Sequence, residues 1–236
     1  MRYRYERKHL ISTHTAAILR GRISAIMRPD SHSGGSYIVN NLYLDDRYDS
    51  FYNGKILGQT KRDKYRIRYY NNDLSFIRLE RKHKNGLVSY KDTMPISREQ
   101  YQMLKSGDMG FILDEKAPLW HTLGVIHRLR GLRPAACFAY KREAYTYEAG
   151  DVRITFDSPP FDFEGNGGIG LKLLGPSLLD YDLLLEVKYT GGLPDIIKRL
   201  LDGLPLGHTD MSKYCMVRER GLLPYGKTRS NTRSTV

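Results

Sequence analysis

The stretch KYRIRYYNNDLSFIRLERK, residues 64–82, decides the fold class of this chain. Along residues 64–70 aromatic or aliphatic side chains alternate with cations, and residues 74–82 repeat the alternation. Because successive side chains of a strand point to opposite faces of a sheet, the pattern predicts two strands with one apolar face and one charged face. The charged face is expected to carry Lys64, Arg66, Arg68, Phe76, Arg78, Glu80 and Lys82.

The same alternation recurs along the rest of the chain. We expect further strands over residues 2–10, 36–44, 87–93, 137–147, 152–157 and 182–189, with irregular ones at 161–163 and 169–174. Helical periodicity is rarer, and it predicts helices over residues 15–27, 47–57, 98–104, 119–129 and 195–201. Since strands follow strands, the order favours an α+β fold with an antiparallel sheet over a doubly wound parallel sheet.

The composition limits the class of protein. With 236 residues and 40% hydrophobic side chains, the chain can bury a core, which excludes disorder and collagen-like repeats. Its 38 Lys and Arg against 26 Asp and Glu give a net charge of +12, which indicates a polyanionic partner: nucleic acid, anionic lipid or a phosphate-rich small molecule. Two cysteines far apart exclude a disulfide framework and fit a reducing compartment. No apolar run reaches about 18 residues, so no membrane-spanning segment is expected.

The charged strand faces have two interpretations. For any single strand, a solvated outer face is the simpler one, because antiparallel sheets commonly face water on one side. Repetition over several strands favours the second, since arginines on neighbouring strands repel one another and require an anion. If the sheet closes with helices packed outside, the charged faces line a pore that could hold a chain of phosphates and a divalent metal.

Seven segments in order carry a resemblance to a known family. They are YERK (5–8), KYRIRY (64–69), RLERK (78–82), KREAY (141–145), VRITFD (152–157), LEVKY (185–189) and SKY (212–214). With them the chain resembles the VTC domain, the catalytic domain of the vacuolar transporter chaperone complex and a triphosphate tunnel metalloenzyme. The resemblance implies a closed antiparallel eight-stranded β-barrel with helices packed outside, and we assign residues 1–220 to it. The polar and basic composition of the remaining residues predicts a flexible tail over residues 221–236.

The resemblance also implies a set of site residues. The family's basic tunnel positions fall on Lys8, Arg66, Arg68, Lys82, Arg142, Arg153, Lys188 and Lys213. Arg78, on the same predicted face, is a further candidate for substrate binding. The family's metal-binding glutamate falls on Glu186, with Glu6 and Glu80 as additional tunnel carboxylates, and the expected cofactor is Mn²⁺ or Mg²⁺.

The implied activity is an ATP:polyphosphate phosphotransferase that extends inorganic polyphosphate. Hydrolytic relatives of the CYTH group carry Glu-x-Glu-x-Lys on the first strand, whereas this chain has Arg4-Tyr5-Glu6-Arg7-Lys8, which favours the polymerase branch. A tripolyphosphatase or nucleoside triphosphatase of the same fold stays open, as does a non-catalytic polyanion-binding module.

The expected partners are ATP and inorganic polyphosphate. Nucleic acid is not expected, because helix-turn-helix, RNP and zinc patterns are missing from the sequence. We expect a bacterial, cytoplasmic protein. A peripheral position at the inner membrane, with a membrane protein as partner in trans, stays open.

Overall fold

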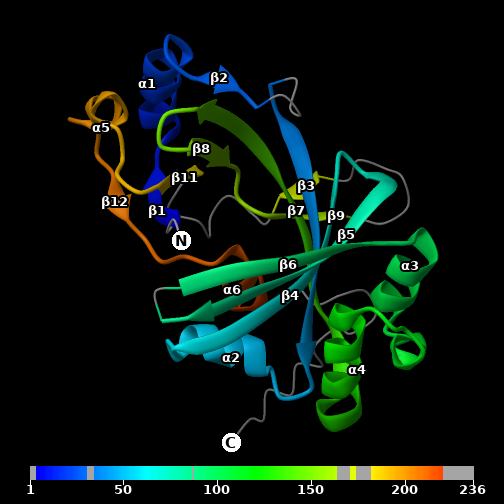
Figure 1. Cartoon of the computed structure of the whole chain (residues 1–236). Helices are drawn as coiled ribbons and strands as arrows, with labels where there is room; N and C mark the ends of the chain where they lie inside the picture. Colours follow the sequence, from blue (N-terminus) through cyan, green and yellow to red (C-terminus); the bar gives the residue numbers. More distant parts are fainter. Residues whose placement is uncertain (1–3, 31–34, 87, 164–170, 174–181, 220–236) are drawn as a thin grey trace, which may run out of the picture. The chain divides into compact units, whose positions relative to one another are not determined.

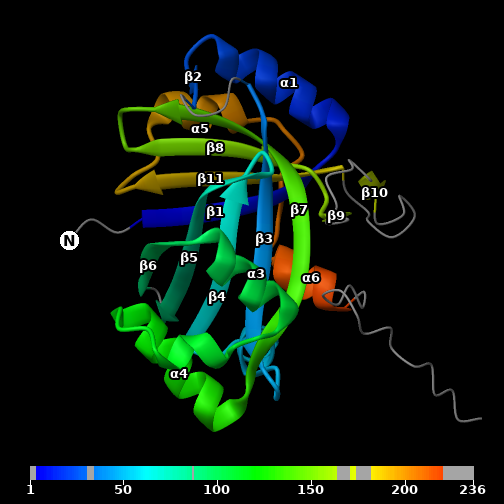
Figure 2. The ribbon, with the colours of Figure 1, turned by 90° about the vertical axis from the view of Figure 1, so that its right-hand side faces the viewer.

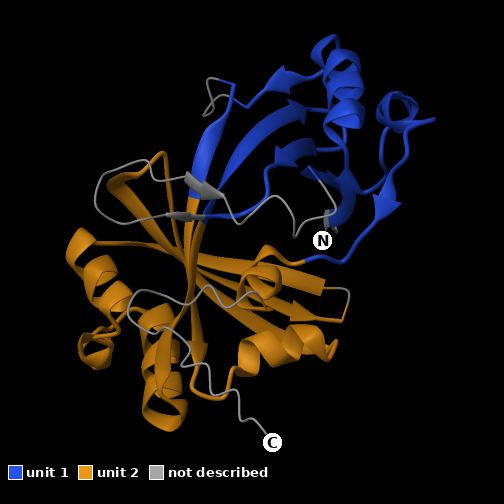
Figure 3. Ribbon diagram, turned by 180° about the vertical axis from the view of Figure 1, so that it is seen from behind, with its two compact units in different colours: residues 1–39, 139–211 blue, residues 40–138, 212–236 orange. Residues whose placement is uncertain are grey.

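The computed structural model describes residues 4–30, 35–86, 88–163, 171–173 and 182–219. The chain divides into two compact units, which Figure 3 shows in blue and orange. Unit 1 comprises residues 1–39 and 139–211, and unit 2 comprises residues 40–138 and 212–236. The predicted tail over residues 221–236 and part of the predicted strand over residues 169–174 lie outside the described residues.

Strands form most of the framework (Figures 1 and 2). Their bounds are β1 Arg4–Ile11, β2 Arg28–Pro29, β3 Tyr37–Asp46, β4 Lys61–Tyr70, β5 Asp73–Asn85, β6 Val88–Ile96, β7 Leu132–Tyr147, β8 Val152–Asp157, β9 Phe161–Phe163, β10 Leu171–Leu173, β11 Leu183–Thr190 and β12 Gly207–His208. The pairs β1–β11, β11–β8, β8–β7, β4–β5 and β5–β6 are all antiparallel. The α+β class with an antiparallel sheet is therefore confirmed.

Each predicted helix is present, and the ends are shifted in all but α5. The helices are α1 Thr13–Ser24, α2 Ser50–Ile56, α3 Arg98–Ser106, α4 Pro118–Arg130, α5 Asp195–Leu201 and α6 Lys213–Glu219, with a 3₁₀ turn η1 at Gly110–Leu113. Helix α1 begins before the predicted start because the Ser12 side chain caps it by accepting from the Thr15 backbone N–H. Within the described ranges, no helix combines the length and apolar character needed to cross a membrane.

In unit 1, α1 and α5 cover the apolar face of the strands. Val187 of β11 and Ile154 of β8 are fully buried together with Ile23 of α1 and Ile197 of α5. These strand residues alternate with charged ones, so the charged side chains of β8 and β11 lie on the face away from the two helices.

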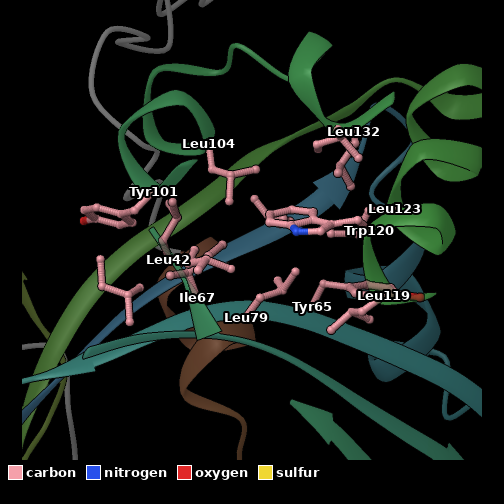
Figure 4. Close-up of a cluster of buried hydrophobic side chains, with 14 of the residues drawn as sticks. Leu42, Tyr65, Ile67, Leu79, Tyr101, Leu104, Leu119, Trp120, Leu123 and Leu132 are labelled. Carbon is pink, nitrogen blue, oxygen red and sulfur yellow. The ribbon is translucent and has the colours of Figure 1, made fainter. Parts of the chain in front are cut away.

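In unit 2, α3, η1 and α4 cover the apolar face of β3, β4 and β5. Trp120 of α4 is 1% exposed and packs in one cluster with Tyr65, Leu79 and Leu104, as Figure 4 shows. The residues that alternate with this core along β4 are Lys64, Arg66 and Arg68, so the cationic face lies away from α3, η1 and α4.

The prediction of a closed eight-stranded barrel is wrong. The hydrogen-bonded order along the main path is β12-β1-β11-β8-β7-β3-β4-β5-β6, with β2, β9 and β10 attached off this path. Among the described strands, β12 and β6 are thus the edges of an open sheet that has more members than expected. Alternation along a strand fixes the face on which each residue lies, but it carries no information on whether the first and last strands pair.

Adjacent residues of α5 provide a test of the packing in unit 1. Ile197 is 0% exposed and Ile196 is 40% exposed. Ile197→Ala should lower the free energy of unfolding by about 2–5 kcal/mol because it opens a cavity against the sheet. Ile196→Ala should cost less than about 1 kcal/mol. Urea denaturation followed by circular dichroism measures both, and equal effects would contradict the placement of α5.

Candidate functional site

The charged face of unit 1 is assembled from four neighbouring strands. In the β1–β11 register Lys8 lies opposite Glu186 and Glu6 lies opposite Lys188. On β8, Thr155 is paired with Glu186 and Arg153 with Lys188, while Arg142 of β7 is paired with Asp157. Residues paired across antiparallel strands share a face. The structure therefore brings together Glu6, Lys8, Arg142, Arg153, Thr155, Asp157, Glu186 and Lys188.

Glu186 is a buried carboxylate among three cations. Its side chain is 8% exposed, and its Oε2 accepts from Lys188 Nζ at 2.9 Å and from Arg142 Nη2 at 3.4 Å. Lys8 Nζ lies 3.9 Å from Oε1. These cations keep Glu186 ionised and hold it in a fixed position on the charged face.

Arg142 is held by a second carboxylate. Its Nε and Nη2 donate to the two oxygens of Asp157 at 2.6 Å each, in a buried bidentate pair. Burial alone would lower the pKa of Arg142, but Tyr140, Asp157 and Glu186 raise it well above its ordinary value. Arg142 is thus a permanent cation, and its Nε and Nη2 groups are bound to Asp157. Its contact from Nη2 to Glu186 orients that carboxylate.

Two buried donors on β8 are unsatisfied among the described residues. Arg153 Nη2 donates to Asp30 at 2.6 Å and to the Tyr37 hydroxyl at 3.0 Å, but its Nε has no acceptor within that part of the chain. The hydroxyl of Thr155, two residues along the same face, has no partner there either. Buried donors without acceptors are uncommon, and a phosphate oxygen is a suitable acceptor.

The charged face of unit 2 follows the same design. Arg66 lies 2.6 Å from Glu80 Oε2, and Lys91 Nζ lies 2.9 Å from Glu80 Oε1. Arg68 donates twice to Asn41 Oδ1, at 3.0 and 2.8 Å. Burial alone would raise the pKa of Glu80, but Arg66, Arg68 and Lys91 lower it to about 2. Glu80 is therefore ionised and holds two cations in fixed positions.

A tyrosine lies beside these cations. Arg66 Nη1 donates to the Tyr43 hydroxyl at 3.2 Å. The Tyr43 ring is stacked between Phe138, with centroids 5.5 Å apart, and Tyr214, with centroids 4.6 Å apart. Burial raises the pKa of Tyr43, whereas Arg66, Arg68 and Lys64 lower it, with a net result of about 8.

The sequence-predicted site residues fall into two groups, one in each unit. Lys8, Arg142, Arg153, Lys188, Glu6 and Glu186 belong to unit 1, and Arg66, Arg68, Arg78, Lys82, Glu80 and Lys213 belong to unit 2. Arg78 lies over the Phe76 ring, 4.3 Å from its centroid, and Lys213 is 9% exposed at the start of α6. A single tunnel that unites both groups stays a prediction.

Several residues of these faces escaped the sequence prediction. Lys91 and Asp157 lie opposite Lys82 and Arg142 in their registers, and Thr155 lies opposite Glu186. Tyr43 contacts Arg66 through side chains. The alternation of the strands placed Thr155 and Asp157 on the charged face of β8, and this was the one available signal for them.

The fit of a divalent metal to unit 1 depends on its carboxylates. Within the described ranges, no group of three or more His, Cys, Asp or Glu is placed to hold an ion. Glu6 and Glu186 do lie on adjacent strands, and Lys188 Nζ is 3.5 Å from Glu6 and 2.9 Å from Glu186. Two carboxylates fit the usual mode of Mg²⁺ binding, in which substrate phosphates and waters complete the coordination. Glu80 belongs to the other unit.

Comparison with known proteins identifies a matching family and structures of similar fold. A family model described as the VTC domain matches residues 3–220. A candidate adenylate cyclase from Bacillus halodurans has a similar fold, with a TM-score of 0.54, 12% identity, and coverage of 89% of this chain and 94% of that one. A candidate adenylate cyclase from Vibrio parahaemolyticus gives 0.50 and 10%, with coverage of 89% and 94%. These identities establish likeness of fold alone. Comparison with curated proteins gives no match.

The Arg142–Asp157 pair generates a prediction on stability. Asp157→Asn should lower the free energy of unfolding by about 3 kcal/mol, because it leaves the buried Arg142 without its balancing charge. Asp92→Asn is the matched control, since the Asp92 side chain is 49% exposed and lies 3.9 Å from Arg81. It should cost less than about 0.5 kcal/mol. Denaturant titration of both variants is the measurement, and a neutral Asp157→Asn would show that the pair does not support the fold.

Proposed function

The chain belongs to the VTC domain family, and from this premise we propose that it is a polyphosphate polymerase. In this proposal the protein transfers the γ-phosphate of ATP onto a growing chain of inorganic polyphosphate. Membership over residues 3–220, nearly the whole chain, supports an enzyme that acts on phosphate compounds. The choice of polymerase over hydrolase rests on Arg4, which replaces the first glutamate of the hydrolytic pattern.

The observation that carries the proposal is the preorganised cationic face in each unit. Arg142 and Arg66 are fixed by Asp157 and Glu80, at 2.6 Å in both cases. Phosphoryl transfer requires cations positioned around the phosphate oxygens before the substrate arrives, and little covalent chemistry from the protein. Carboxylates that hold the cations in place before the substrate binds meet this requirement.

The residues of the two faces have different roles in the proposed mechanism. Lys8, Lys188 and Arg153 in unit 1, and Arg66, Arg68, Arg78, Lys82 and Lys213 in unit 2, bind and orient the phosphates. Arg142 is a positioning residue, because its fork is bound to Asp157 and its further contact is with Glu186. The terminal phosphate of the acceptor chain is already ionised and attacks in line, so a general base is not required.

A divalent metal completes the proposed site. Glu186, with Glu6 on the adjacent strand, would hold Mn²⁺ or Mg²⁺ together with substrate oxygens. When bound, the metal would offset the charge that develops on the phosphate oxygens. Lys8 and Lys188 contact both glutamates and would keep them oriented.

A metal-dependent tripolyphosphatase or nucleoside triphosphatase is the second candidate, because the same cations would bind a triphosphate while water attacks. A non-catalytic module is the third, and the net charge of +12 alone favours it. ATP and polyphosphate are the proposed partners in the first case. A cytoplasmic location and a membrane protein as partner in trans are further parts of the proposal.

Product analysis distinguishes the three candidates. Purified protein incubated with ATP and Mn²⁺ should yield long-chain polyphosphate, visible by gel electrophoresis. Glu186→Gln should reduce synthesis by about 100-fold or more, because the residue loses the charge that would hold the metal. Release of free phosphate alone would support the phosphatase. Binding of polyphosphate that survives chelation, without turnover in the presence of metal, would support the module.

The cations of both units should matter to turnover. Arg66→Ala and Lys8→Ala should each lower kcat/KM by about 30- to 100-fold, which corresponds to a lost charge-assisted phosphate contact. Arg128→Ala, an exposed position on α4, is the control and should stay within about twofold. Steady-state kinetics with ATP measures all three. A loss confined to one of the two variants would mean that only one unit binds substrate.

A further inference from the structure

Tyr43 is a buried polar side chain next to the cations of unit 2. It is 7% exposed, and its ring lies between Phe138 of β7 and Tyr214 of α6, with interplanar angles of 7° and 16°. A ring stacked on both faces cannot turn its hydroxyl elsewhere. The hydroxyl therefore stays beside Arg66, whose Nη1 donates to it at 3.2 Å.

The proton of this hydroxyl has no acceptor among the described residues. The Tyr43 oxygen accepts from Arg66 and makes no further hydrogen bond in that part of the chain. Tyr214 differs, because its hydroxyl donates to Asp45 Oδ2 at 2.6 Å, whereas Tyr69 and Tyr101 share one hydrogen bond at 3.2 Å in the helix-covered core. What sets Tyr43 apart is its position beside Arg66, where a hydroxyl with a proton to donate suits an anionic acceptor from outside the protein.

The surroundings define the charge of that acceptor. The ionisable groups facing the phenol are Lys64, Arg66 and Arg68 from β4, with Tyr214 from α6, whose own hydroxyl is bound to Asp45. These cations lower the pKa of Tyr43 against the opposing effect of burial. The environment thus stabilises negative charge at the phenol oxygen, or at an anion that accepts its hydrogen bond.

We propose that Tyr43 is a substrate-binding residue whose hydroxyl donates a hydrogen bond to a phosphate oxygen held by Arg66. The inference rests on the proposed function, because it assumes that the cationic face of unit 2 receives a phosphate chain. It adds to that function a neutral donor. Arg66 and Arg68 attract the phosphate by charge, whereas the fixed phenol of Tyr43 adds a directional hydrogen bond. This hydrogen bond restricts the positions that a phosphate of the polyphosphate chain can occupy.

The test compares two tyrosine-to-phenylalanine variants of the full chain. Tyr43→Phe keeps the stacked ring and removes only the hydroxyl, so the fold should persist. Tyr101→Phe makes the same change in the helix-covered core of the same unit, and its hydroxyl faces Tyr69. Isothermal titration with inorganic tripolyphosphate should show binding about tenfold or more weaker for Tyr43→Phe, and unchanged for Tyr101→Phe.

A spectroscopic measurement separates substrate contact from a structural role. In the wild-type protein a tyrosine should ionise near pH 8, visible as tyrosinate absorbance that Tyr43→Phe lacks. Tripolyphosphate should move this ionisation to higher pH, because the bound anion opposes a second negative charge beside it. A purely structural tyrosine would not respond to the ligand.

The outcomes distinguish this inference from the proposed function. If the wild type binds tripolyphosphate and Tyr43→Phe binds it equally well, the inference is overturned and the proposed function stands. If the wild type binds tripolyphosphate with the expected loss in Tyr43→Phe but makes no polyphosphate, the inference stands and the polymerase does not. If the wild type fails to bind tripolyphosphate, both are overturned.

Discussion

The pairing of buried arginines with single carboxylates is the interaction on which the charged faces depend. A buried guanidinium loses hydration and is repelled by neighbouring cations, and a carboxylate at hydrogen-bond distance offsets both costs. Asp157 meets this need for Arg142 and Glu80 meets it for Arg66. The apolar core on the opposite face fixes the strands, the strands fix the carboxylates, and the carboxylates fix the cations. Because the face of unit 2 has more cations than carboxylates, it remains attractive to a polyanion.

Strand alternation made the fold class and much of the site predictable. The strand Val152–Asp157 and the helix Asp195–Leu201 have the bounds expected from their periodicity. Helix α6 escaped detection because Lys213 to Val217 are all buried, so the segment has no polar stripe. Strand β12 has two residues, too few to show a period. Closure of the barrel was the main error, since edge pairing is a property of the assembled sheet and leaves no mark on one strand.

The register between strands decides which cation each carboxylate contacts, and this explains why the sequence did not reveal some of the site residues. A sequence shows which residues share a face, but a carboxylate is matched to its cation by the register between strands. Asp157 faces Arg142 because β7 and β8 pair in one register, and a slip of one residue would turn Asp157 to the opposite face. The role of Tyr43 was harder still to predict from sequence patterns, because its position depends on aromatic rings from β7 and α6, which are distant along the chain.

The contacts of Asp45 determine when unit 2 can complete its folding during translation. It accepts backbone N–H groups from Phe51 and Tyr52 at 3.0 Å each and the hydroxyl of Tyr214 at 2.6 Å, so it joins an early segment to the end of the described chain. Unit 2 is interrupted by the whole second segment of unit 1, residues 139–211. While the ribosome is still adding that insert, Tyr43 lacks one of its two flanking rings and Asp45 lacks its phenol. The polar half of unit 2 therefore matures only after α6 emerges from the exit tunnel.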